Sequence, residues 1–227
     1  MDTPLNGIRA CVFDAYGTLF DTASAAARAK DQIGDNFVPF AQLWRDKQLQ
    51  YTWLRAAQGR HTDFWQVTSE ALDFTMETFG IVDDALRRRL MELYLTLAPF
   101  PEVGSVLSQL KDAGMKTAIL SNGTPAMLKA AVESSDIEDL LDNVLSVEEV
   151  GVFKPHPKVY QLAVDRLGLP VEALVFVSSN GWDVHAASAF GMRTVWCNRY
   201  GQKAERLPGE PDRMVSTLAA LPALVVV

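Results

Sequence analysis

Asp14 is the residue of this chain best placed to act as a nucleophile. It follows the apolar pair Val12-Phe13 and precedes a tight turn through Gly17 and Thr18. An apolar run of this kind predicts a buried strand. A carboxylate at the carboxyl end of the first strand of an α/β sheet lies where such folds carry out their chemistry. Taken alone, Asp14 is explained as simply by a helix N-cap.

Three further polar segments follow apolar runs later in the chain. Ser121-Asn122-Gly123 offers a hydroxyl, an amide and backbone N–H groups at a helix start, which together favour an anion. Lys154 precedes a proline in a connection between a strand and a helix, where its ammonium group would favour the ionised form of Asp14. The third segment is Ser178-Ser179-Asn180-Gly181-Trp182-Asp183. Polar turns and a solvated surface lysine are the plain alternatives.

The elements that would position these residues alternate between short apolar runs and helical patterns. Strands are expected at residues 8–13, 116–120, 143–147, 174–177 and 194–196. Helices are expected at residues 103–113, 125–134, 157–167 and 182–190. Strands that alternate with helices predict an α/β fold with a Rossmann-like parallel sheet, right-handed crossovers and helices on both faces. The polar segments would then meet at one edge of the sheet.

The stretch between the first strand and the rest of the sheet has a different character. It is rich in helix formers and aromatic residues at helical spacing, and it contains no convincing strand. We therefore expect a Rossmann-like catalytic core of residues 1–20 and 99–227 and an inserted helical cap domain of residues 21–98. An insertion that follows the strand of Asp14 would lie over the site and could exclude water from it.

Composition and charge limit the classes of function. The chain has 227 residues, of which 48% are hydrophobic, and a net charge of −7, so a nucleic-acid partner is not expected. Cys11 and Cys197 are expected to be buried free thiols, and three histidines make a zinc site improbable. The N-terminus shows no signal peptide, and the apolar stretch 219–227 is too short to cross a membrane. We expect a cytoplasmic protein with no membrane partner.

These segments resemble the motifs of the haloacid dehalogenase superfamily, and most closely those of the L-2-haloacid dehalogenases. Phosphatases of that superfamily carry a general acid two residues after the nucleophile, where this chain has Tyr16. A halide ion leaves without a proton, so Tyr16 agrees with a dehalogenase. The phosphatases also place an acidic pair where this chain has Ser178 and Asn180 before Asp183, which makes a poor magnesium site. The resemblance therefore implies an enzyme with no metal and no cofactor.

The resemblance also implies roles for individual residues. Asp14 would be the nucleophile, aimed by Thr18, and the other catalytic residues would be Lys154, Asp183, Asn180, Ser178 and Arg45. Ser121, Asn122 and Arg45 would bind the carboxylate and the halide of the substrate. An apolar pocket around C2 would be lined by Tyr16, Trp182, Leu49 and Phe64, with Tyr160 as a supporting residue. Ordinary core packing is the alternative for the four pocket residues.

The function implied is the hydrolysis of L-2-haloalkanoic acids to D-2-hydroxyalkanoic acids. Asp14 would attack C2 with inversion, and water would then attack the carboxyl carbon of the aspartyl ester, with Asp183 as the candidate base. The alternatives are cleavage of another C–X bond, as in fluoroacetate or a strained cyclic amine, a superfamily phosphatase, and a non-catalytic carboxylate-binding protein. The family also commonly forms dimers, so a homodimer is expected.

Overall fold

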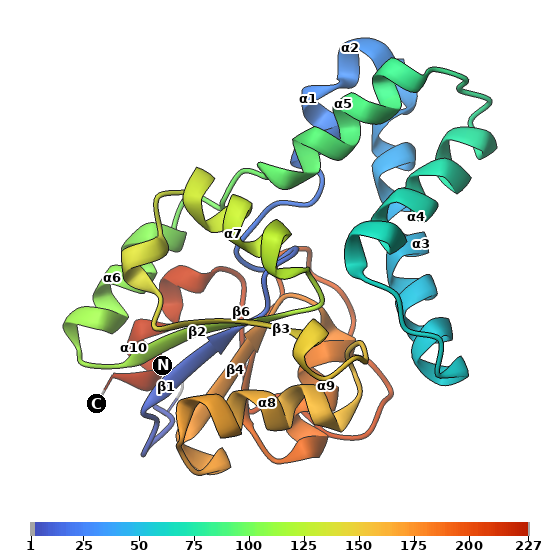
Figure 1. The fold of residues 1–227 in the computed structure, drawn as a ribbon. Coiled ribbons are helices and arrows are strands. Elements are labelled where there is room, and N and C mark those ends of the chain that lie inside the picture. Colours follow the sequence, from blue (N-terminus) through green and yellow to red (C-terminus); the bar gives the residue numbers. More distant parts are fainter. Residues whose placement is uncertain (1–2, 227) are drawn as a thin grey trace.

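A six-stranded parallel sheet forms the centre of the computed structural model, which describes residues 3–226 (Figure 1). The strands are β1 (Ala10–Phe13), β2 (Lys116–Ser121), β3 (Asn143–Ser146), β4 (Leu174–Ser178), β5 (Arg193–Cys197) and β6 (Arg213–Val215). The first five confirm the expected strands, with small differences at their ends. The sequence analysis missed β6, because this short edge strand lacks an apolar run that would distinguish it from a loop.

Strand β1 lies at the middle of the sheet, which has the order β3-β2-β1-β4-β5-β6. It pairs in parallel with β2 on one side and β4 on the other, and all of its residues are buried. The strand order therefore reverses direction at β1. In open parallel sheets, ligands bind beyond the carboxyl ends of the strands at such a point, and Asp14 is the first residue after β1.

Within residues 3–226, five α-helices accompany the sheet: α6 (Val103–Asp112), α7 (Pro125–Ser134), α8 (Pro157–Leu167), α9 (Gly181–Phe190) and α10 (Pro222–Val225). Helices α6 and α10 contact each other, and so do α8 and α9. The chain passes from β1 to β2 and β3 in one direction and from β4 to β5 in the other. Right-handed crossovers therefore place the connecting helices on both faces, which confirms the expected fold class.

The segment between β1 and α6 is helical and stands beside the carboxyl end of β1 (Figure 1). Its helices are α1 (Ser24–Arg28), α2 (Lys30–Ile33), α3 (Phe37–Gln58), α4 (Phe64–Thr78) and α5 (Asp84–Leu95). The chain enters and leaves this segment side by side, since Phe20 bridges Pro99 and Asp21 N donates to Ala98 O at 2.8 Å. The two ends of the expected cap domain, residues 21 and 98, therefore lie next to each other.

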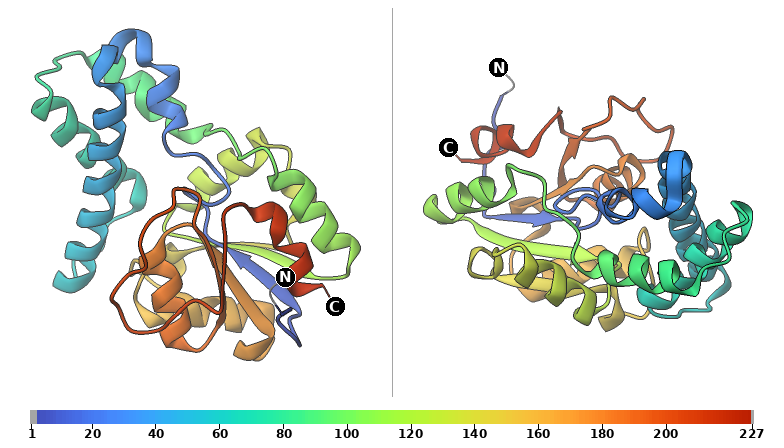
Figure 2. Two further views of the ribbon diagram at one scale, coloured as in Figure 1. Left: turned by 180° about the vertical axis from the view of Figure 1, so that it is seen from behind. Right: turned by 90° about the horizontal axis from the view of Figure 1, so that it is seen from above.

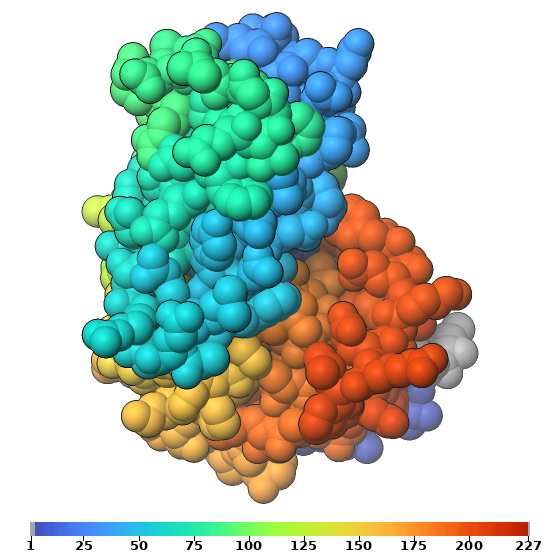
Figure 3. All heavy atoms as spheres, turned by 90° about the vertical axis from the view of Figure 1, so that its right-hand side faces the viewer, coloured from blue at the N-terminus to red at the C-terminus, as the bar shows by residue number. Residues whose placement is uncertain are grey.

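The views from behind and above show α1–α5 at one end of the sheet, with α10 at the other (Figure 2). In the space-filling view, this blue-to-green segment lies directly against the yellow and orange surface of the core (Figure 3).

A buried polar network fixes which face of α3 turns toward the core. Trp44 Nε1 donates to Thr68 O at 2.9 Å, and Gln48 Nε2 donates to Thr68 Oγ1 at the same distance. Tyr94 Oη donates to Gln48 Oε1 at 3.2 Å. With Trp44 and Gln48 held against the other helices, helical spacing leaves their neighbours Arg45 and Leu49 to face the sheet.

Cys11 and Cys197 are buried and free, as expected. No helix within residues 3–226 has the length and apolar character needed to cross a membrane. Met1, Asp2 and Val227, which enter the expectations about the two ends of the chain, lie outside the described residues.

Candidate active site

The predicted site residues converge on one small cavity beyond the carboxyl ends of β1, β2 and β4. Its walls consist only of residues predicted for the site: Asp14, Tyr16, Arg45, Leu49, Phe64, Ser121, Asn122, Lys154, Asn180 and Trp182. The remaining four, Thr18, Ser178, Tyr160 and Asp183, lie behind this wall. Thr18 and Ser178 donate to Asp14, Asp183 accepts from Lys154, and Tyr160 donates to Asp183. The free volume is only about 10 Å³, which is about the space of one water molecule. Side chains must therefore move to admit a larger ligand.

The two oxygens of the Asp14 carboxylate are bound unequally. Oδ2 accepts from Asn180 Nδ2 at 2.8 Å, Thr18 Oγ1 at 3.1 Å and Ser178 Oγ at 3.4 Å. Oδ1 accepts at 3.1 Å from Lys154 Nζ, its one partner within residues 3–226. Three donors thus hold the carboxylate through Oδ2, and Oδ1 keeps a free lone pair.

Thr18 is itself held from two sides. Its Oγ1 accepts from Ser179 N at 2.8 Å, and its carbonyl oxygen accepts from Arg199 Nη2 at 2.9 Å. Arg199 also pairs with Glu102 at 2.6 Å and lies over the Phe100 ring, 3.8 Å from its centre. The sequence analysis missed Arg199, because a single arginine in a loop after β5 has no pattern that distinguishes it from a surface residue.

Lys154 links two buried carboxylates. Its Nζ lies 3.1 Å from Asp14 Oδ1, 2.8 Å from Asp183 Oδ2 and 4.7 Å from the centre of the Phe176 ring. Burial opposes the positive charge, but the two carboxylates outweigh it and raise the pKa of Lys154 above its ordinary value. Lys154 is therefore a fixed cation beside Oδ1.

Asp183 lies behind Lys154 in the first turn of α9 and is fully buried. Its Oδ1 accepts from Tyr160 Oη at 2.7 Å, and its Oδ2 accepts from Lys154. Burial, together with the nearby charge of Asp14, raises the pKa of Asp183 to about 6, against the opposing effects of Lys154 and Tyr160. Such a carboxylate is ionised at neutral pH and can take up a proton readily.

The Ser121-Asn122-Gly123 turn presents an amide donor to the cavity. Asn122 Oδ1 accepts from Lys154 N at 3.0 Å, which orients the side-chain amide. Its Nδ2 donates to no other residue in the described range and belongs to the cavity wall. Ser121 Oγ accepts from Gly123 N at 3.1 Å and keeps its own hydroxyl proton to donate. Both groups can therefore bind an anion.

Tyr16 occupies the position at which a general acid would stand. Its ring stacks on Tyr94, with 5.6 Å between the ring centres, and also packs against Phe64 at 5.7 Å. Its hydroxyl is buried with no hydrogen-bond partner within the described part of the chain. Burial raises the pKa of Tyr16 well above its ordinary value. The packing of Tyr94 onto this ring was not predicted, although its helical spacing from Leu86 and Leu90 indicates a buried position.

Arg45 from α3 and Trp182 from α9 complete the wall of the cavity. Arg45 comes from α3, and its Nη2 donates to Tyr16 O at 3.1 Å. Trp182 comes from α9, and its buried Nε1 has no partner in the range 3–226. The cavity therefore combines donors from Arg45, Trp182 and Asn122 with an apolar wall and the Asp14 carboxylate.

The comparisons with known proteins agree with this geometry. The model of the haloacid dehalogenase-like hydrolases matches residues 8–191. The chain belongs to this family. (S)-2-haloacid dehalogenase 1 from Pseudomonas sp. (strain CBS-3) is 43% identical to this family member over 222 residues, covering 97% of this chain and 98% of that protein.

Solved structures of dehalogenases are similar to this chain over nearly its whole length. A crystal structure of a dehalogenase has a TM-score of 0.96 and 42% identity, covering 98% of this chain and 99% of that chain. The L-2-haloacid dehalogenase from Xanthobacter autotrophicus, with chloropropionic acid covalently bound, has a TM-score of 0.90 and 38% identity, covering 96% of this chain and 98% of that chain.

Proposed function

We propose that this hydrolase converts L-2-haloalkanoic acids to D-2-hydroxyalkanoic acids through an aspartyl ester, with inversion at C2. The observation that carries the proposal is the Asp14 carboxylate, which three donors hold through Oδ2. Oδ1 accepts only from Lys154 within residues 3–226 and keeps a lone pair with which to attack. The buried ring of Tyr16, which stands where a phosphatase needs its acid, supports a leaving group that requires no proton. The names of the relatives support the same substrate class.

In the first step, Asp14 Oδ1 forms a bond to C2 while the carbon–halogen bond breaks. The halide leaves with the bonding electrons, and we assign its stabilisation to Arg45, Asn122 Nδ2 and Trp182 Nε1. Ser121 and the backbone of its turn bind the substrate carboxylate. Donors aimed at the departing charge in a cavity with little water lower the barrier more than they would in bulk solvent.

In the second step, water attacks the carboxyl carbon of the Asp14 ester and gives a proton to Asp183. The C2–Oδ1 bond is kept and the bond from Oδ1 to the carboxyl carbon breaks. Oδ1 leaves as the hydroxyl oxygen of the product and takes the second proton of the water, and the water oxygen stays on Asp14. The negative charge of the tetrahedral intermediate develops on the carbonyl oxygen Oδ2, which keeps its three donors. Lys154, 3.1 Å from Oδ1, stabilises the charge that reaches Oδ1 as its bond to the carboxyl carbon breaks. The overall reaction consumes one water and releases one halide and one proton.

We propose that residues 21–98 act as the cap of this site. Arg45 now donates to Tyr16 O, and the cavity holds about one water molecule, so substrate binding requires Arg45 to exchange this carbonyl for the substrate. We also propose a homodimer, because the family resemblance implies one, and a cytoplasmic location. Sedimentation equilibrium tests the homodimer, and cell fractionation tests the cytoplasmic location.

Halide release from L- and D-2-chloropropionate, in the presence of excess EDTA, tests the function. We expect release from the L form alone, undiminished by EDTA, with D-lactate as the product. A matched assay with p-nitrophenyl phosphate and magnesium serves as the control. Phosphate release without halide release would contradict the proposal and indicate a phosphatase.

A further inference from the structure

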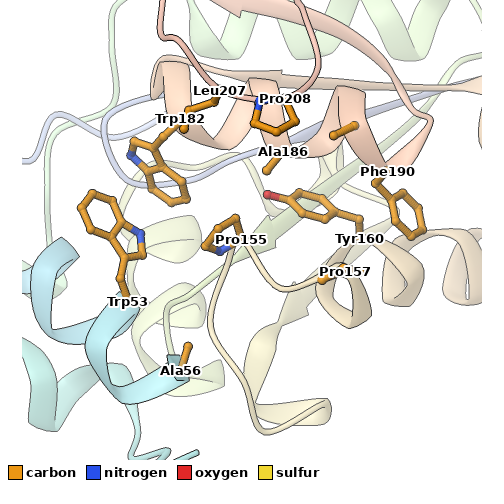
Figure 4. A pocket seen from close by; sticks show the side chains of 11 residues that line it. Trp53, Ala56, Pro155, Pro157, Tyr160, Trp182, Ala186, Phe190, Leu207 and Pro208 are labelled. Carbon is orange, nitrogen blue, oxygen red and sulfur yellow. The ribbon is translucent and has the colours of Figure 1, made fainter. Parts of the chain in front are cut away.

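A second and much larger cavity adjoins the candidate active site. Its volume is about 670 Å³, which is in the usual range for small-molecule sites. The close-up shows its walls, which carry no charged side chain: Trp53, Ala56, Pro155, Pro157, Tyr160, Trp182, Ala186, Ala189, Phe190, Leu207 and Pro208 (Figure 4). We call this cavity the apolar groove. Trp53 and Leu207 remain 39% and 48% exposed, so covering them would be favourable.

The apolar groove lies next to the small cavity at Asp14, which we call the reaction cavity. Trp182 belongs to the walls of both. On α3, Leu49 lines the cavity and Trp53, one turn later on the same helix face, lines the groove. Trp53 and Trp182 meet edge to face with their ring centres 5.3 Å apart, and Figure 4 shows the two rings next to one another. This tryptophan pair forms the boundary between the two spaces.

The outer wall of the groove is held in place. Leu207 and Pro208 precede Gly209, whose φ is +80° and whose missing side chain lets the loop approach the backbone of α9. His185 Nδ1 lies 2.7 Å from Gly209 O, and Ser188 Oγ donates to Glu210 O at 2.7 Å. The groove is therefore a preformed feature of the fold, so that binding in it does not require a loop to order.

We infer that the apolar groove binds the alkyl tail of 2-haloalkanoic acids with medium or long chains, the carboxylate and C2 remaining at Asp14. This inference rests on the proposed function. The reaction cavity has no room for a long tail, and the groove is the apolar space on the other side of its Trp182 wall. A long tail reaches the groove when the Trp53–Trp182 pair moves apart. A charged head group would find no partner there, since the Tyr160 hydroxyl already donates to Asp183.

A chain-length series of L-2-bromoalkanoates from three to ten carbons, kept below their micelle concentrations, tests the inference. A fully buried methylene contributes about 0.8 kcal/mol, which corresponds to about a fourfold gain in kcat/KM per methylene. Because the groove is open to solvent on one side, we expect about a twofold to fourfold gain for each methylene that lies in it.

Two adjacent alanines of α3 provide matched variants. Ala56 lines the groove and Ala57 does not. We expect Ala56→Trp to abolish the gain with chain length and Ala57→Trp to retain it, with the ratio of kcat/KM for 2-bromodecanoate to 2-bromopropionate as the readout. Ala189→Trp fills the groove from α9 and serves if Ala56→Trp fails to fold.

The outcomes separate the two proposals. Halide release from 2-bromopropionate with no gain for longer chains would overturn the groove assignment and leave the proposed function intact. An equal loss of the gain in both alanine variants would also overturn it. No halide release from any member of the series would contradict the proposed function itself.

Discussion

Replacing Tyr160 by phenylalanine tests whether Asp183 is the base for hydrolysis of the ester. Tyr160 Oη donates at 2.7 Å to Asp183 Oδ1 and does not touch Asp14. The substitution removes one hydrogen bond to the ionised carboxylate and changes little in volume. Tyr160 is therefore a positioning residue in this account, and its loss should act through the pKa of Asp183.

The size of the effect follows from the hydrogen bond that is lost. A hydrogen bond to a charged group contributes about 1.5–3 kcal/mol, and one pH unit corresponds to about 1.4 kcal/mol. Removing the bond from the ionised form should therefore raise the pKa of Asp183 by about one to two units. In the free protein the starting value is about 6. In the ester it lies lower, because Asp14 has lost the charge that contributes to raising it.

The assay is a single turnover with rapid quench, in which the decay of the ester is followed from pH 5 to pH 9. Because the base must be ionised, the decay rate should rise with pH and then level off. Tyr160→Phe should shift this rise to higher pH. The variant should be slower by about tenfold to a hundredfold on the acid side of both profiles, and the two should converge near pH 9. A loss that is the same at every pH would refute the reasoning.

Three further substitutions have expected outcomes. Asp14→Asn should reduce halide release to background without changing the circular dichroism spectrum, and activity that persists after deamidation is excluded would contradict the nucleophile assignment. Lys154→Met leaves two buried carboxylates without their shared cation, and urea unfolding should show a loss of about 3–5 kcal/mol; an unchanged midpoint would contradict the buried pairing. Gly123→Ala places a Cβ 2.7 Å from Tyr16 Cε2. Displacing this packed ring should cost about 1–3 kcal/mol of stability and lower kcat, whereas wild-type values for both would show that the ring is free to move.

Local sequence patterns predicted most of the core. Strands such as β1 and β4 are short apolar runs ended by a polar residue, and this pattern marks both the strand and the site at its end. Strand β6 could not be predicted in the same way, because Arg213 and Met214 lie on a partly exposed edge. Its place in the sheet depends on tertiary contacts with β5 that no local pattern encodes.

The same local patterns predicted the candidate site residues that lie at strand ends, but not those of the helical segment. Residues at strand ends, such as Asp14 and Asn122, follow from the fold class, since parallel strands end at one edge. Arg45 was selected only through the family resemblance, because helical spacing gives the face of α3 but not its orientation toward the sheet. The network of Trp44, Gln48 and Tyr94 sets that orientation, and it joins segments far apart in the sequence.

A single turnover in ¹⁸O-labelled water, with excess protein over L-2-chloropropionate, tests the central claim most directly. Mass spectrometry of the peptide that contains Asp14 and of the lactate product locates the label. If water attacks the carboxyl carbon of the aspartyl ester, the label should appear in Asp14 and be absent from the first lactate formed. Label in the lactate and none in Asp14 would mean that water attacks C2 directly, and would contradict the covalent mechanism.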